Sequence, residues 1–130
     1  MFLTFFQLVK IEGESMYPTL CDKERIVVLK NYHSIQKNDI IVFSTDDGYA
    51  VKRVIATPHE TVALLEHSVF INGIKISPYT YDGDMDVIFE LKEDQYFVIG
   101  DNYQASYDSR DYGPICAEQI VGRMFLFVTL

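Results

Sequence analysis

The clearest indication of the fold is the stretch VFINGIKI at residues 69–76. Asn72 and Gly73 tolerate the positive φ angles of a type I′ turn, and short runs rich in β-branched and aromatic residues flank them. This combination predicts a β-hairpin. A second hairpin is predicted where Asp46-Asp47-Gly48 separates two further strand-like runs.

Outward from this hairpin, most segments alternate apolar and polar residues or form short β-branched runs, a pattern typical of strands. We therefore predict a mainly β chain. Helix is expected only as single turns at 16–20 and 117–119, and the acidic, turn-rich stretch 77–86 is expected to be an exposed loop or flap. The predicted strands are 6–12, 25–30, 39–44, 49–57, 60–65, 69–71, 74–76, 86–91, 96–99 and 120–128.

Length and charge limit the classes of function. The 130 residues, 48% of them hydrophobic, fit one domain spanning 1–130. Eleven Lys and Arg against nineteen Asp and Glu give a net charge of −8, which argues against nucleic acid as a partner. The apolar opening 1–9 is too short for a spanning helix, so the chain as given is expected to be soluble.

The cysteines do not indicate a metal site. Cys21 and Cys116 are far apart in sequence and neither belongs to a CxxC pair. Two unrelated thiols, or a long-range disulfide on an extracytoplasmic surface, both fit this pattern. No metal or cofactor is expected.

A candidate nucleophile lies in GESMYPTL at residues 13–20. Ser15 stands where a predicted strand enters a turn stiffened by Pro18, a junction that can expose a hydroxyl beside backbone N–H groups. Acyl transfer needs both a nucleophile and such an oxyanion hole. A serine that only caps or shapes the turn is the alternative.

A serine nucleophile needs a base, and Lys52 is the best candidate. The histidines His33, His59 and His67 lie in turn-like positions without a triad motif, whereas Lys52 has apolar neighbours in the strand-like run 49–56. Burial can lower a lysine pKa from about 10.4 by up to roughly 3 to 5 units. Arg53 should point to the opposite face of the strand. The alternative is a lysine whose amine reaches solvent.

A third polar block, GDNYQASYDSRDYG at residues 100–113, follows the apolar run 96–99. This arrangement is typical of a functional loop mounted on a core strand. A calcium-binding loop is the alternative, but the bidentate glutamate at loop position 12 is absent.

Together these blocks resemble the type I signal peptidases, and the resemblance covers nearly the whole chain. Four blocks stand in the family's order: 13–20, KNDIIVF at 37–43, VKRVI at 51–55, and 100–110. The resemblance implies a signal-peptidase-like fold, related to that of the repressor proteases, with antiparallel sheets and one or two short helical turns. The short span between the third and fourth blocks is similar to the compact, Gram-positive-like domains of the family.

The same resemblance assigns roles within the site. Ser15 would attack the scissile carbonyl to form an acyl-enzyme, and Lys52 would act as general base. Ser106 matches a serine that hydrogen-bonds the lysine nitrogen. The Ser15 backbone N–H would form one arm of the oxyanion hole, while Gly13 stands where some members carry a hydroxyl residue as the second. Two ion pairs would brace the loop: Asp101 with Arg53, and Asp108 with Arg110.

The resemblance also implies a substrate and a location. The expected partners are preprotein signal peptides, bound as an added strand and cut after small residues in an Ala-x-Ala pattern, and membrane lipid in an anchored form. We expect the domain on the extracytoplasmic face of the cell membrane, with residues 1–6 as a stub of an anchor removed by truncation or naturally absent. The expected substrate-binding residues are apolar: Val9, Ile11, Met16, Leu20, Ala50 and Val51.

One departure from the family concerns a turn. The base block continues as Pro58-His59-Glu60 where the family commonly has Pro-Gly-Asp, so we expect a different turn there without loss of activity.

Two other functions compete with proteolysis. A non-catalytic homologue could serve as an assembly or chaperone module, for example in pilus building, but such a chain would be free to lose Ser15, Lys52 or Ser106, and all three are present. A self-cleaving Ser-Lys repressor would need an internal Ala-Gly or Cys-Gly site, and neither dipeptide occurs.

Overall fold

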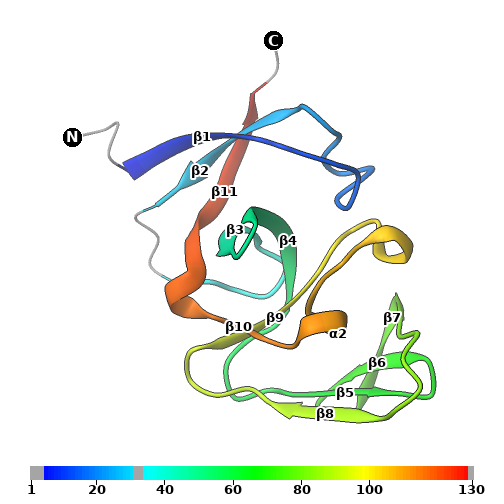
Figure 1. Cartoon of the computed structure of the whole chain (residues 1–130). Helices are drawn as coiled ribbons and strands as arrows, with labels where there is room; N and C mark the ends of the chain where they lie inside the picture. The colour runs from blue at the N-terminus through cyan, green and yellow to red at the C-terminus, as the bar shows by residue number, and fades with distance from the viewer. Residues whose placement is uncertain (1–4, 31–33, 129–130) are drawn as a thin grey trace.

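The computed structural model describes residues 5–30 and 34–128, in which the strands form two antiparallel sheets (Figure 1). The larger sheet has the order β1-β2-β11-β3-β4-β9-β10, and the smaller has the order β7-β6-β5-β8. The mainly β prediction is therefore confirmed. The strands of the larger sheet are β1 (Phe6–Lys10), β2 (Arg25–Leu29), β3 (Ile40–Thr45), β4 (Gly48–Ala56), β9 (Gln95–Ile99), β10 (Ile115–Cys116) and β11 (Ile120–Val128). Those of the smaller sheet are β5 (Thr61–Leu65), β6 (Ser68–Ile71), β7 (Ile74–Thr80) and β8 (Val87–Glu90).

Both predicted hairpins form. Ile71 pairs with Ile74 across the β6–β7 turn, where Asn72 and Gly73 have φ angles of 50° and 81°. Thr45 pairs with Gly48 across the β3–β4 turn. That turn consequently presents the side chains of two successive aspartates at the tip of the hairpin.

The stretch 77–86 was expected to be a loop, but its first part belongs to β7, which extends to Thr80. The chain tolerates Pro78 there because β7 is the edge strand of the smaller sheet and because Pro78 falls in the irregular stretch between Lys75 and Thr80, which pair with β6. A shift in register between Ser68 and Phe70 also accommodates the added length.

Helical structure is confined to short turns within the described residues. At 16–20 a single turn forms, closed by a bond from the Leu20 N–H to the Met16 carbonyl (2.9 Å), and 117–119 forms the 3-10 helix η2 (Ala117–Gln119). The polar block 100–113 contains two elements that we did not predict: η1 (Tyr103–Ala105) and α2 (Ser109–Tyr112). Asp108 and Asp111 form a capping box that starts α2, which is a signal that the sequence contained.

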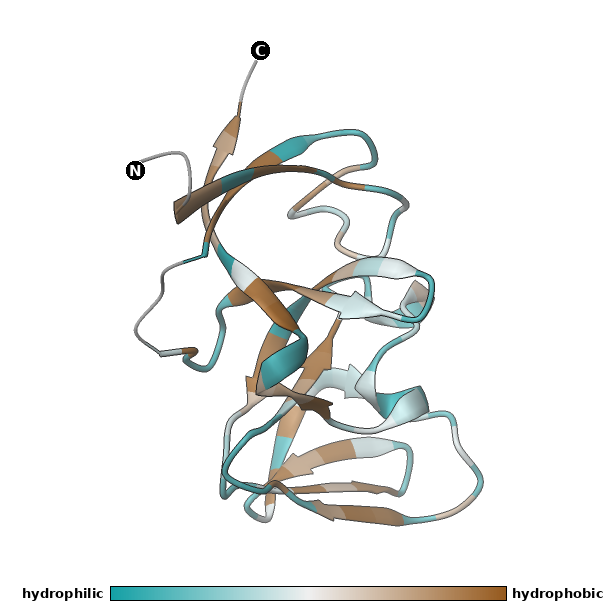
Figure 2. Cartoon of the chain, turned by 60° about the vertical axis from the view of Figure 1, so that its left-hand side comes forward, coloured by the Kyte–Doolittle hydropathy of each residue, from teal (hydrophilic) through white to brown (hydrophobic). Residues whose placement is uncertain are grey.

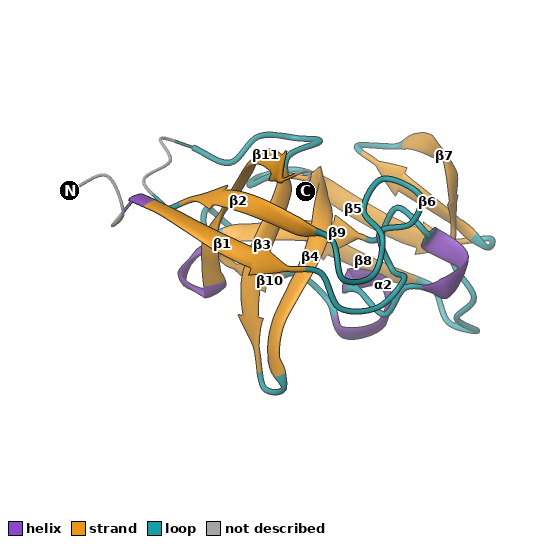
Figure 3. Ribbon diagram, turned by 90° about the horizontal axis from the view of Figure 1, so that it is seen from above, coloured by secondary structure: helices purple, strands orange, loops and turns teal. Residues whose placement is uncertain are grey.

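The larger sheet connects the two ends of the molecule. In Figure 1, β1, β2 and β11 lie at one end, the smaller sheet lies at the other, and β3, β4 and β9 run between them; the view from above in Figure 3 also places the smaller sheet to one side. One core cluster includes Met16, Leu20 and Val42, and another packs β9 and the end of β4 against the smaller sheet. Figure 2 shows hydrophobic residues continuing to the outer ends of β1 and β11.

None of the helices in the described part of the chain is long and apolar enough to cross a membrane. Residues 1–4 of the expected anchor stub, and also His33, lie outside the described residues.

Candidate active site

Ser15 and Lys52, far apart in sequence, meet in space. Ser15 lies in the turn that follows β1, and Lys52 lies in the middle of β4. Lys52 Nζ lies 2.7 Å from Ser15 Oγ and is hydrogen-bonded to it. The predicted partners are thus within the distance needed for direct proton transfer.

The environment of Lys52 favours its uncharged form. The residue is only 6% exposed and lies opposite Ile41 in the β3–β4 register. Burial lowers the pKa of the Lys52 amine below its ordinary value; the positive charge of Arg110 adds to this, while the negative charge of Asp108 opposes it. This is the shift that a lysine base requires at neutral pH.

Arg53 and Asp101 form a two-pronged ion pair, as expected. Arg53 Nε donates to Asp101 Oδ1 (2.8 Å), and Arg53 Nη2 donates to Oδ2 (2.7 Å). Burial alone would raise the pKa of Asp101, but hydrogen bonds from Arg53 and from the Thr19 hydroxyl hold this pKa below its ordinary value. Asp101 therefore connects β4 to the loop that carries Ser15.

The main chain strengthens this connection. The Asn102 N–H donates to the Ser15 carbonyl (2.9 Å), and the Asn102 side-chain amide donates to the Glu14 carbonyl (3.1 Å). The loop after β9 thus holds the peptide groups on both sides of Ser15.

Asp108 is the centre of the supporting loop and is fully buried. It accepts hydrogen bonds from the Gly100 N–H (3.0 Å), from the Ser106 hydroxyl (2.7 Å) and from Arg110 Nε (2.9 Å) and Nη2 (2.9 Å). The expected Asp108–Arg110 ion pair is present. Because these partners satisfy its oxygens, the buried carboxylate holds the loop in one conformation.

Ser106 differs from expectation. Its hydroxyl donates to Asp108 and makes no hydrogen bond with Lys52 in the described structure. It nevertheless borders the site: a Cβ built on Gly100 would lie 2.2 Å from Ser106 Oγ and 2.6 Å from the Ser15 carbonyl oxygen. Ser106 and the Ser15 backbone therefore pack against the same face of Gly100, while the Ser106 hydroxyl is engaged by Asp108.

A groove of about 550 Å³ opens beside Ser15 and Lys52. Five of the six expected substrate-binding residues line it: Val9, Ile11, Met16, Ala50 and Val51. The sixth, Leu20, is fully buried in the core cluster with Met16 and Val42 and does not line this groove. We did not predict Tyr49 and Asp47, which add a polar rim from the β3–β4 hairpin.

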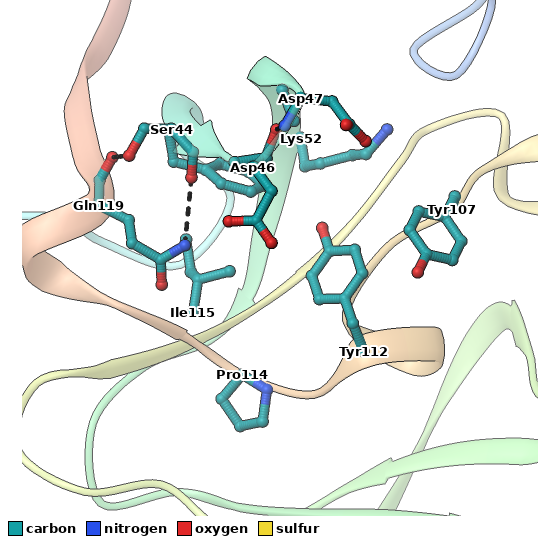
Figure 4. A pocket seen from close by; sticks show the side chains of 12 residues that line it. Ser44, Asp46, Asp47, Lys52, Tyr107, Tyr112, Pro114, Ile115 and Gln119 are labelled. Atoms are coloured by element: carbon teal, nitrogen blue, oxygen red, sulfur yellow. Dashed lines mark hydrogen bonds between the residues drawn. The ribbon is translucent and has the colours of Figure 1, made fainter.

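A second cavity, of about 800 Å³, lies between the β3–β4 hairpin and the segment that includes α2 (Figure 4). It meets the groove at three shared residues, Asp47, Ala50 and Lys52. No motif predicted it, since its walls come from segments far apart in sequence. Its lining includes Ser44, Asp46, Tyr107, Tyr112, Pro114, Ile115 and Gln119.

The remaining candidates lie outside the site. His59 and His67 occupy turns with positive φ angles, and neither lines the groove or the second cavity. Cys21 and Cys116 are free thiols, so the disulfide alternative is wrong. The described residues contain no group of three or more His, Cys, Asp or Glu side chains placed to hold a metal ion.

The backbone around Gly13 limits what can bind an oxyanion. Gly13 has a φ angle of 88°, which favours glycine, and its N–H already donates to Asp22 Oδ1 (2.7 Å). Gly13 also has no hydroxyl to contribute. Of the groups named for this role, the Ser15 N–H remains the candidate.

Known proteins of one family resemble this chain. The family described as "Signal peptidase, peptidase S26" matches residues 1–129. A signal peptidase I of Bacillus amyloliquefaciens is 35% identical over 86% of this chain and 70% of its own length, and signal peptidase I T of Bacillus subtilis strain 168 is 36% identical over 90% and 70%. A crystal structure of a signal peptidase I from Enterococcus faecalis V583 superposes with a TM-score of 0.56 at 26% identity, covering 73% of this chain and 100% of that one. The chain therefore belongs to the signal peptidase family, peptidase S26.

Proposed function

We propose that this protein is a serine endopeptidase that removes signal peptides from preproteins, with Ser15 as nucleophile and Lys52 as general base. The observation that carries the proposal is the 2.7 Å contact between Ser15 Oγ and the amine of Lys52, a residue that is only 6% exposed. A neutral lysine has a lone pair that can accept the Ser15 proton, whereas an ammonium ion has none.

In the proposed reaction, Ser15 Oγ attacks the scissile carbonyl while its proton passes to Lys52 Nζ. The Ser15 N–H stabilises the resulting oxyanion. Lys52 then gives the proton to the leaving amine as the C–N bond breaks, and an acyl-enzyme forms. Lys52, neutral again, takes a proton from water, which attacks the ester and restores Ser15.

The groove supports a substrate with small residues before the cut. An extended peptide that runs along β1 and β4 would direct alternate side chains toward Val9, Ile11, Met16 and Val51. Because Ile11 and Met16 are almost fully buried, the floor of the groove is shallow at these positions. Alanine at the first and third positions before the cut fits such a floor.

The test is cleavage of an Ala-x-Ala peptide in detergent or lipid by Ser15→Ala and Lys52→Met variants. In each variant kcat should fall by about 100-fold to 10,000-fold, because each substitution removes a group essential to proton transfer. Matched controls are Ser34→Ala and Lys75→Met, which change exposed residues outside both cavities and should keep full activity.

Full turnover in the Ser15→Ala or Lys52→Met variant would refute the dyad. A wild-type protein that binds the peptide but never cuts it would favour the non-catalytic assembly module instead.

A further inference from the structure

We propose that the outer face of β1 forms a subsite for the fourth substrate residue before the cut, and that Leu8 makes this subsite favour an apolar side chain. The subsite depends on the proposed function, because it requires a peptide that is held in the groove and cut at Ser15. It lies on the face of β1 opposite to the shallow floor that receives the first and third residues before the cut.

β1 has a free edge that can bind an added strand. It is the outermost strand of the larger sheet, and within residues 5–30 and 34–128 only β2 pairs with it. On the side of β2, the Ile11 N–H donates to the Glu24 carbonyl (2.7 Å), and the Ile11 carbonyl accepts from the Lys23 N–H (2.7 Å). The main-chain groups of successive residues point to opposite sides of a strand, so those of Leu8 and Lys10 point away from β2. Both residues line the groove, where a substrate strand would bind these groups.

The groove determines the direction of the substrate. It extends from Ser15 along β1 to Gln7, so residues further before the cut lie closer to the start of β1. In the proposed complex, the first and third residues lie beside Ile11 and Val9, whose side chains pack in one core cluster. Both strands advance about 3.3 Å per residue and alternate their faces, so the fourth residue lies beside Leu8 and points away from the core.

Leu8 belongs to an apolar row that crosses three strands. It pairs with Val27 of β2, and Val27 pairs with Leu126 of β11, so the three side chains lie on one face of the sheet. Leu8 is 57% exposed and Leu126 is 44% exposed. An apolar fourth residue would extend this row and remove part of the Leu8 surface from water, which is favourable. A polar residue at the same position would gain much less.

The next row on the same face is charged. Lys10 pairs with Arg25 across β1 and β2, and both side chains are exposed. Alternate residues of an added strand share a face, so the second residue before the cut would lie beside Lys10. The preference for an apolar residue should therefore hold at the fourth position and be absent at the second.

The experiment uses soluble peptides with one Ala-x-Ala segment, cleaved at a fixed detergent concentration. One pair of peptides differs only at the fourth residue before the cut, which is Leu or Asn. A second pair differs in the same way at the second residue, the x of the segment. We expect kcat/KM to be about twofold to fivefold higher with Leu at the fourth position, the range of an apolar cross-strand pair, and nearly equal within the second pair.

The decisive variant is Leu8→Asn, which should bring the Leu-to-Asn ratio at the fourth position close to 1. Leu8→Met keeps an apolar side chain and should retain the ratio. The matched control is Ile88→Asn, which changes an apolar residue of similar exposure (64%) on the smaller sheet, away from the groove, and should behave as wild type. Each ratio compares two peptides on the same protein, so a variant that folds less completely does not change it.

The outcomes separate the subsite from the proposed function. Equal cleavage of the first pair by the wild type, or a ratio that Leu8→Asn does not alter, would overturn the subsite and leave the proposed function intact. If Leu8→Asn slowed all peptides by the same factor, Leu8 would be a contact for detergent or lipid, and the subsite would again be overturned. An equal preference for Leu at the second position would contradict the proposed register. If the wild type cut none of the peptides, the proposed function would fail and the subsite with it.

Discussion

In the proposed mechanism, the buried amine of Lys52 makes peptide cleavage depend on the pH of the solution. Since burial lowers its pKa, kcat/KM should rise with pH as the neutral fraction grows, and the limb should have an apparent pKa below the ordinary 10.4 of lysine. A pH–rate profile of peptide cleavage between pH 6 and pH 11 measures this apparent pKa. A limb centred near 6.5 would implicate a histidine and contradict the role of Lys52.

Single residues differed in how far the sequence could place them. Apolar neighbours were enough to predict that Lys52 is buried, because a strand alternates its faces. The sequence could not show that Met16 lines the groove while Leu20 does not, because apolar residues occur equally in a groove wall and in the core. The sequence also could not predict the hydrogen-bond partner of Ser106, because this partner depends on differences of a few ångströms in the loop conformation.

At the scale of elements, Gly100 fixes how closely the supporting loop approaches the nucleophile. Gly100→Ala would place a methyl group against Ser106 Oγ and the Ser15 carbonyl, so the Ser15 loop must move. We expect kcat to fall at least tenfold, because small displacements of a nucleophile are costly. Peptide cleavage and thermal unfolding, measured together, test this.

Gly122→Ala serves as the control for Gly100→Ala. Its Cβ would lie 2.4 Å from Val28 Cγ1 and 2.6 Å from the Leu29 carbonyl oxygen, inside the β2–β11 pair and away from the residues that line the groove. It should destabilise the fold by about 1–3 kcal/mol, while the folded fraction keeps its kcat. Equal loss of kcat in both variants would contradict a specific role for Gly100.

The Arg53–Asp101 pair joins β4 to the supporting loop and should contribute to stability above acid pH. Asp101→Asn should lower the free energy of unfolding by about 1–2 kcal/mol at pH 7, since a charge-assisted pair is broken. The native pKa of Asp101 is lowered, so this contribution is present above the unfolded value of about 3.9 and is lost as the pH falls through the native pKa. Urea denaturation at pH 7 and pH 3 should therefore show a smaller difference at pH 3.

Elements were predictable where their pattern was long enough. Nine-residue β4 and β11 showed clear strand patterns, and Asn72-Gly73 marked its own turn. Two-residue β10 is too short to show any period and exists because it pairs with β9. Helix α2 was missed because its polar residues, read as a loop, are held by Asp108 at its cap.

For the whole molecule, large apolar side chains gather at one end. Phe6 contacts Phe125 with ring centroids 5.3 Å apart, and Leu8, Phe125 and Phe127 are each more than 45% exposed. Such a surface on a chain of net charge −8 should favour zwitterionic over anionic lipid.

We therefore expect Phe125→Ser with Phe127→Ser to reduce co-sedimentation with phosphatidylcholine vesicles severalfold. Ile74→Ser with Ile88→Ser, at exposed positions of the smaller sheet, is the matched control and should bind as wild type. Unchanged binding of the first variant would show that this end of the molecule is not the lipid contact.

The order of strands could not be predicted from the sequence, because β11, at the C-terminal end of the chain, lies between β2 and β3 in the sheet. The resemblance of four short blocks predicted the fold class and the meeting of Ser15 with Lys52. It did not predict the second cavity, whose walls depend on how the β3–β4 hairpin lies over α2.

Lys52 lies in the interior half of β4, whereas Asp47 and Tyr49 reach the rim of the groove from the exposed β3–β4 hairpin, so the two sets of residues have separate freedom to vary. A gene duplicate could exchange the hairpin residues and acquire a different groove rim while Lys52 and its buried surroundings stayed unchanged.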